Sequence, residues 1–231
     1  MQKKLITYCL WGEDVVYCKG ALKNIELAKI FYPEFICRFY VAKDLDKSLI
    51  KELNKNAEVV VSDEIGSPQM MMDRFLPIGE DVNIFLSRDT DSRIGKREQH
   101  IVNEWIVSDT KLHIIRDHPF HDVKMLGGMW GLKNKPIDIQ KLIYEFKQTP
   151  QFENKKNCDQ IFLWNYIYPL FSEFEILRHD DHFGGFPIKI NRHDDDNTFF
   201  IGQPIGIDEN GNDFELYPHD RIKLEQVWGN K

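Results

Sequence analysis

Hydrophobic positions along the first 95 residues switch repeatedly between two spacings. Short apolar runs bounded by polar or turn-forming residues predict four strands, at residues 5–10, 36–42, 58–62 and 82–86. Apolar residues three or four positions apart predict helices between these strands, at residues 16–31, 46–55 and 70–76. Pro33 ends the first of these helices and Pro77 the last. Strands that alternate with helices in this way are typical of an α/β fold with a mainly parallel central sheet.

The alternation is less regular after residue 95, although the same signals continue. They predict helices at residues 96–107, 137–146 and 159–171, strands at 111–116 and 174–178, and a glycine-rich turn at 126–131. A terminal helix is expected at residues 220–227, and the rest of this half is interpreted as long loops. The acidic run at residues 194–196 is interpreted as a solvated loop without a functional role. No repeat or linker divides the chain, so we expect a single domain over residues 1–231.

Composition and charge narrow the range of partners. The net charge of −7 argues against nucleic acid or another polyanion held by general electrostatics. The 231-residue chain is 42% hydrophobic, and it is long enough to bury a substantial core. No apolar run approaches the ~20 residues of a membrane span. The four cysteines form no C-x-x-C pair and are interpreted as buried free thiols. We therefore expect a cytoplasmic protein without an integral membrane segment, either free or peripheral to a membrane.

Two aspartates, Asp89 and Asp91, follow the strand predicted at residues 82–86. Ligands bind at the carboxyl ends of strands in open α/β sheets, and residues two positions apart at a strand end point to the same side. The two carboxylates can therefore share one divalent cation, which takes oxygen ligands and often also contacts substrate phosphates. Arg88 and Arg93 flank the pair. The alternative is a polar loop in which the aspartates cap a turn.

Further motifs surround this pair in a fixed order. Arg74 lies in the helix that precedes it, and the turn at residues 126–129, then Asp159 with Gln160, then a strand ending at His179 follow it. This ordered set resembles the GT-A type nucleotide-sugar transferases, in particular the retaining family 8-like glycosyltransferases. Residues 116–121 (RDHPFH) together with 127–131 (GGMWG) resemble glycosyltransferase-like proteins of bacteria and viruses that are linked to surface polysaccharides. The resemblance spans roughly residues 5–203 and implies a GT-A fold. Its donor-binding half would lie at about 1–95 and its acceptor and catalytic half at about 96–231.

The resemblance implies a metal-dependent enzyme that moves a sugar from a nucleotide-diphosphate sugar, with a UDP-sugar favoured, to a glycan or glycoconjugate acceptor. Asp89, Asp91 and His179 would hold Mn²⁺ or Mg²⁺, which neutralises the diphosphate as it leaves. The family 8 ending His-x-x-Gly-x-Lys-Pro-Trp is replaced here by residues 179–187, HDDHFGGFP. This difference leaves open whether His179 or His182 contacts the metal, and whether the sugar's configuration is retained.

The same resemblance assigns further residues to the donor. The candidates are Tyr8, Leu10, Trp11, Arg74, Arg88, Asp89, Gly127 and Gly128. Tyr8, Leu10 and Trp11 would contact the nucleotide base, although an aromatic side chain at a strand end is also compatible with core packing. Arg74 would contact a phosphate or the sugar, with a surface ion pair as the alternative. The two glycines would let the sugar approach the backbone closely.

The catalytic candidates are Asp159, Gln160, Asp117 and His118. Asp159 and Gln160 would lie beside the anomeric carbon and stabilise an oxocarbenium-like transition state, and a helix cap is the alternative for Asp159. His118 and His121 would contact the donor sugar or the acceptor, and one of them or Asp117 would act as a base in an inverting mechanism. The alternative for both histidines is a hydrogen bond to the backbone of their loop.

Two other functions remain possible from the sequence. A metal-dependent phosphohydrolase is suggested by the His121-Asp122 and His179-Asp180 pairs. Such enzymes usually hold two metals with ligands from several helices, whereas these pairs lie near strand ends. A non-catalytic protein that binds a nucleotide sugar would carry the same binding residues.

Overall fold

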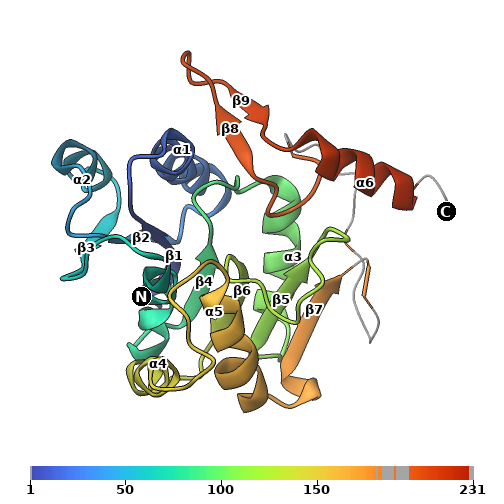
Figure 1. The fold of residues 1–231 in the computed structure, drawn as a ribbon. Helices are drawn as coiled ribbons and strands as arrows, with labels where there is room; N and C mark the ends of the chain where they lie inside the picture. Colours follow the sequence, from blue (N-terminus) through green and yellow to red (C-terminus); the bar gives the residue numbers. More distant parts are fainter. Residues whose placement is uncertain (1, 181, 184–189, 191–197, 229–231) are drawn as a thin grey trace.

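A seven-stranded sheet with the strand order β3-β2-β1-β4-β6-β5-β7 runs through the centre of the protein (Figure 1). The structure is a computed structural model that describes residues 2–180, 182–183, 190 and 198–228. The strands are β1 Lys4–Leu10, β2 Ile36–Val41, β3 Glu58–Val61, β4 Ile84–Arg88, β5 Leu112–Arg116, β6 Met129–Lys133 and β7 Ile176–Asp180. Only β6 runs antiparallel to its neighbours within this sheet, so β1, β4, β5 and β7 point the same way.

Helices cover both faces of the sheet. The covering helices are α1 Val15–Phe31, α2 Lys47–Leu53, the 3₁₀ helix η1 Pro68–Gly79, α3 Lys96–Val107, α4 Ile139–Lys147 and α5 Cys158–Phe162, and a further helix, α6 Pro218–Trp228, lies near the C-terminus. Beyond α5 the chain continues through a π-helical turn η2 Leu163–Ile167 and two short 3₁₀ turns, η3 Tyr168–Leu170 and η4 Glu173–Glu175. A separate hairpin of β8 Ile205–Ile207 and β9 Asp213–Glu215 packs near α1 (Figure 1).

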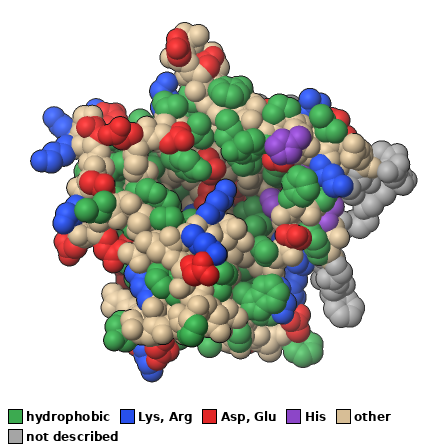
Figure 2. All heavy atoms as spheres, viewed as in Figure 1, with side chains coloured by type: hydrophobic (Ala, Val, Ile, Leu, Met, Phe, Trp, Pro, Cys, Tyr) green, Lys and Arg blue, Asp and Glu red, His purple; other side chains and the backbone are tan. Residues whose placement is uncertain are grey.

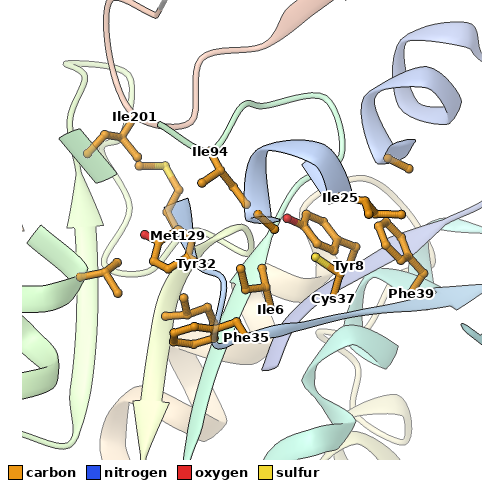
Figure 3. Packing of buried hydrophobic residues seen from close by; sticks show 14 of the residues in the cluster. Ile6, Tyr8, Ile25, Tyr32, Phe35, Cys37, Phe39, Ile94, Met129 and Ile201 are labelled. Carbon is orange, nitrogen blue, oxygen red and sulfur yellow. The ribbon is translucent and has the colours of Figure 1, made fainter. Parts of the chain in front are cut away.

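The strands bury side chains on both faces and so produce two apolar clusters. Neighbouring residues of β4 show the alternation, because Leu86 belongs to one cluster and Phe85 to the other. The first cluster lies under α1 and α3, and Figure 3 shows Tyr8, Ile25 and Phe39 from β1, α1 and β2 pointing toward one another. The second cluster lies under η1, α4 and α5. Burying one large apolar side chain contributes roughly 1.5–3 kcal/mol, so both helical layers are held firmly on the sheet.

The strand and helix alternation predicted for the first 95 residues is confirmed. The predicted turn at residues 126–131 is only half right, because Met129–Lys133 forms β6 between β4 and β5. Its side chains Trp130 and Leu132 are buried, and a Cβ at Gly131 would lie 2.9 Å from Phe85 O. The glycine therefore permits close strand packing here rather than a turn.

The second half contains further differences. The helix predicted at residues 159–171 is interrupted, since it passes from α-helix through a π-helical turn to a 3₁₀ turn containing Pro169. The hairpin of β8 and β9 was missed because each strand has only three residues. The acidic run at residues 194–196 lies outside the described residues. No helix in the described part of the chain is both long and apolar enough to cross a membrane.

Candidate active site

A cavity of about 550 Å³ opens at the carboxyl ends of β1 and β4. Its walls come from the segments that follow these strands, from η1, from the loop between β5 and β6, and from the start of α5. Figure 2 shows a hollow near the middle of this face, where acidic and basic side chains lie close together. Crevices at the carboxyl ends of strands are the usual ligand sites of open α/β sheets. The predicted site residues that line it are Leu10, Trp11, Arg74, Asp89, Asp91, Gly127, Asp159 and Gln160.

The two aspartates after β4 lie on the wall of this cavity, as the sequence predicts. Burial, and the charge of Asp89 beside it, raise the pKa of Asp91 from 3.8 to about 7. Two carboxylates whose charges repel each other fit a divalent cation, which relieves the repulsion. No group of three potential His, Cys, Asp or Glu ligands occurs among the described residues. Asp89 and Asp91 are the described residues whose carboxylates could hold such a cation.

Arg74 connects the first aspartate to Asp159 across the cavity floor. Its Nη1 pairs with Asp89 Oδ1 and donates to the carbonyl of Arg88, while its Nη2 donates to Asp159 Oδ2 at 2.8 Å. The side chains of Arg74 and Asp159 are each 3% exposed, whereas that of Asp89 is 46% exposed. Burial raises the pKa of Asp159, and the guanidinium of Arg74 counteracts part of this rise. The floor thus carries one guanidinium beside three carboxylates, an arrangement that attracts a cation.

The helix η1 explains why Arg74 points inward. Pro68 occupies its first turn, where the absence of a backbone N–H does no harm. Met72 and Phe75 are fully buried in the cluster under the sheet, and they fix the face that η1 turns toward β4. Arg74 stands on the same buried side and reaches the strand end.

Gly127 and Gly128 are required by the close approach of these charged groups. A Cβ at Gly127 would overlap both the Asp159 carboxylate and the Arg74 guanidinium. A Cβ at Gly128 would overlap the carboxylate of Asp89 and lie 2.9 Å from the Asp89 backbone nitrogen. Only Gly127 lines the cavity, so the direct contact with a sugar predicted for Gly128 is corrected to a packing role against Asp89.

Asp159 and Gln160 lie in the first turn of α5, and both line the cavity. The cap of this helix is Asn157, whose φ of 72° places it in the left-handed region. The alternative that Asp159 is the cap is therefore wrong, and its carboxylate pairs with Arg74 instead.

Tyr8 and Arg88 do not reach the cavity, which corrects their assignment to the donor. Tyr8 is fully buried and stacks on Phe39 with ring centroids 4.7 Å apart. Arg88 is also buried, and its Nε donates to Glu98 Oε1 at 2.8 Å. Strand alternation explains the case of Arg88, because a side chain one position away from the cavity-facing Asp89 points to the opposite face. Tyr8 lies further back along β1, where it belongs to the apolar cluster under α1 and α3.

Asp117 and His118 also lie outside the cavity wall, so the structure does not support a base role for either. The Asp117 carboxylate is fully buried and accepts from the backbone N–H of Ile201 at 2.7 Å. The His118 ring lies between two backbone groups, accepting from Phe120 N at 3.0 Å and reaching the carbonyl of Asp220 at 2.9 Å. These contacts anchor the C-terminal segment onto the loop after β5.

His179 is not brought to the two aspartates, which corrects its prediction as a metal ligand. Its ring is fully buried at the end of β7 and lies 2.8 Å from His113 Nε2 on one side and 2.8 Å from Glu104 Oε2 on the other. The neighbouring Asp180 pairs with Arg116. His182 donates its backbone N–H to Asp180 at 2.8 Å, and part of its loop lies outside the described residues.

The structure adds cavity residues that sequence reasoning did not place there. They are Cys9, Gly12, Glu13, Asp14, Tyr17, Pro68, Met71, Thr90, Lys156, Asn157, Gly202 and Pro204, whereas His121, Leu126 and Met129 belong to motifs that the sequence analysis singled out. Lys156 is exposed and lies in the polar loop just before α5. The sequence signal that could have placed it at the site is its position three residues before Asp159. Gly202 and Pro204 belong to the segment predicted only as a loop, so no sequence signal placed them.

Comparison with solved structures supports the fold that the sequence resemblance implies. A glycosyltransferase involved in the glycosylation of the major capsid of PBCV-1 superimposes with a TM-score of 0.52 over 77% of this chain and 81% of its own, at 14% identity. The chain has a GT-A type fold. S. aureus TarS gives a TM-score of 0.41 at 14% identity, covering 70% of this chain and 54% of its own. The 4-diphosphocytidyl-2C-methyl-D-erythritol synthase of Anaerococcus prevotii gives 0.45 at 9% identity, covering 98% and 96%. No protein-family model and no curated protein sequence matches this chain.

Proposed function

We propose that this protein is a metal-dependent glycosyltransferase that moves a sugar from a nucleotide-diphosphate sugar to a glycan or glycoconjugate acceptor. One arrangement carries the proposal: Asp89, Asp91, Arg74 and Asp159 meet at the floor of one cavity at the carboxyl edge of the sheet. The GT-A type fold is compatible with this chemistry, although fold alone does not determine function. A UDP-sugar is the favoured donor and Mn²⁺ or Mg²⁺ the favoured cation, both from the family resemblance.

The diphosphate of the donor would lie over the acidic floor. When bound, a divalent cation held by Asp89 and Asp91 supplies the positive charge that stabilises the leaving diphosphate. Arg74 pairs with the half-exposed Asp89, and from this position its guanidinium can also reach an incoming phosphate or sugar oxygen. Lys156 adds a second positive charge to the cavity wall.

The remaining cavity residues would orient the two ends of the donor. Leu10 ends β1 and Trp11 follows it, and both would offer an apolar surface to the nucleotide base. Asp159 and Gln160 lie on a rigid helix start, where they would position or stabilise the sugar at its anomeric carbon. The family 8 resemblance does not assign retention or inversion of configuration, because residues 179–187 differ from the family ending. Proton NMR of the first product formed would distinguish the two outcomes.

A thermal-shift panel tests the proposal. Wild-type protein is heated with UDP-, GDP- and dTDP-sugars, each with and without Mn²⁺. A ligand present at ~100 times its Kd adds about 2.7 kcal/mol of apparent stability. We expect a Mn²⁺-dependent shift with at least one nucleotide sugar, which Asp91→Asn abolishes. The matched control Asp109→Asn changes an exposed aspartate at the opposite edge of the sheet and should keep the full shift.

Two other outcomes would favour the other functions. Hydrolysis of simple phosphate esters without any response to the panel would support a phosphohydrolase. The placement of His179 and Asp180 away from the cavity argues against it. Binding without hydrolysis or transfer over a broad acceptor panel would support a non-catalytic binder.

A further inference from the structure

The order of strands gives the cavity two distinct ends. Trp11 follows β1, Asp89 follows β4, Gly127 precedes β6 and His121 follows β5. Since these strands are neighbours in the order β1-β4-β6-β5, Trp11 and His121 lie on opposite sides of the acidic floor. If the nucleotide base lies against Trp11, the end at His121 faces the sugar and the acceptor.

Packing holds the ring of His121 in one orientation. Its Nδ1 accepts from the backbone N–H of Asp117 at 3.1 Å. Its ring lies edge-on to Phe200, with centroids 5.7 Å apart, and at the same distance from the ring of His118. His121 lines the cavity, whereas Asp117 and His118 behind it do not. Within the motif at residues 116–121, His121 thus reaches the cavity, and Asp117 and His118 support it from behind.

The protonation state of this ring follows from its surroundings. Burial, together with the neighbouring His118, His182 and Arg116, lowers the pKa of His121 from 6.5 to about 3. The ring is therefore neutral at physiological pH. Because Nδ1 accepts a hydrogen bond, the single ring proton lies on Nε2. No hydrogen-bond partner for Nε2 is found among the described residues, and the side chain of His121 lines the cavity.

The wall around His121 suggests which chemical group it meets. The other lining residues from the loop that carries His121, from the start of β6 and from the segment after Phe200 are Leu126, Gly127, Met129, Gly202 and Pro204, which carry no charge. A neutral N–H donor among apolar side chains suits a carbohydrate, which offers hydroxyl oxygens and apolar C–H faces. A phosphate is better served by charged donors such as Arg74 at the cavity floor. With its proton on Nε2, His121 has no free lone pair at this nitrogen. It therefore cannot bind a metal or act as a general base through Nε2.

We propose that His121 is a sugar-positioning residue, whose Nε2–H donates a hydrogen bond to a carbohydrate hydroxyl at the end of the cavity opposite Trp11. This inference rests on the proposed function and specifies one contact within the same site. The hydroxyl belongs either to the sugar of the donor or to the acceptor glycan, and separate measurements distinguish these two sources.

Binding measurements on two variants test the inference. His121→Leu removes the donor, whereas His121→Gln replaces it with an amide N–H. His100→Gln makes a matched change at an exposed histidine on α3. For each protein, calorimetry gives the Kd of the nucleotide sugar with the largest thermal shift and the Kd of its parent nucleoside diphosphate. Transfer assays give the acceptor KM.

We expect His121→Leu to bind the nucleoside diphosphate within about twofold of wild type, because no sugar is present. Loss of one hydrogen bond should raise either the Kd of the nucleotide sugar or the acceptor KM by about tenfold, with partial recovery in His121→Gln. A rise in the first quantity identifies the donor sugar as the source, and a rise only in the second identifies the acceptor. His100→Gln should match wild type in all three.

Three results would overturn the inference. The first is unchanged values for both sugar ligands in His121→Leu. The second is an equal loss for the nucleoside diphosphate and the nucleotide sugar, which would mean that His121 supports the cavity as a whole. The third is a ¹⁵N NMR spectrum between pH 5 and 8 that places the proton on Nδ1. A fourth result is distinct from these three: if wild-type protein binds none of the nucleotides, the proposed function itself is overturned, and this inference with it.

Discussion

Replacement of Arg74 by methionine should destabilise the protein strongly, because it leaves a carboxylate buried without its partner. Arg74 and Asp159 are each 3% exposed and lie 2.8 Å apart. Removing one member of such a buried pair typically costs about 3–5 kcal/mol. The second partner, Asp89, is half exposed, so losing that contact adds at most about 1 kcal/mol. For a protein of this size, a loss of about 3–5 kcal/mol lowers Tm by roughly 6–20 °C.

Urea denaturation of four proteins measures this effect: wild type, Arg74→Met, Asp159→Asn and the double variant. Asp159→Asn in the Arg74→Met background removes the uncompensated charge, so the double variant should be more stable than Arg74→Met alone. The two changes should therefore couple by about 2 kcal/mol or more. Arg221→Met is the matched control, because the ion pairs of Arg221 are far more exposed than that of Arg74 with Asp159, and its urea midpoint should stay close to that of wild type. An Arg74→Met protein within about 1 kcal/mol of wild type, or additive effects in the double variant, would refute the reasoning.

Three further predictions concern the surroundings of the site. Gly127→Ala should displace Arg74 and Asp159, cost about 1–3 kcal/mol and weaken the response to nucleotide sugars in the thermal-shift panel. Burial raises the pKa of Asp73 from 3.8 to about 6, so this carboxyl binds its proton more tightly when folded. Its contribution to stability is present below about pH 4 and is lost as the pH rises through about 6, by at most about 3 kcal/mol. Urea titrations of Asp73→Asn should therefore lack this slope, and an unchanged slope would contradict the assignment. His179→Gln should lower stability by about 1–3 kcal/mol yet keep Mn²⁺-dependent nucleotide binding, whereas loss of that binding would restore His179 as a ligand candidate.

The parts of the fold that follow from local patterns were predictable. Alternating apolar runs identified the strands of the first half, and the carboxyl end of β4 placed Asp89 and Asp91 at the ligand edge. Spacing along one strand does not show which neighbours pack beside it, so β6 remained hidden inside a glycine-rich segment. Its glycine is needed because Gly131 packs against Phe85, a contact that depends on the tertiary fold.

The placement of individual histidines was not predictable for the same reason. The residues between 116 and 121 contain two histidines three positions apart, and nothing local distinguishes them. The structure turns His118 toward the C-terminal helix and His121 toward the cavity. His179 ends a strand, as the resemblance requires, but its ring meets Glu104 from α3. That contact joins residues 75 positions apart, beyond any local pattern.

Crystals grown with Mn²⁺ and a nucleoside diphosphate would test the central claim most directly, through the anomalous signal of manganese. The account predicts one manganese peak between the carboxylates of Asp89 and Asp91 and the diphosphate, with Trp11 against the base. A nucleotide bound in the cavity with no manganese beside either aspartate would contradict the account.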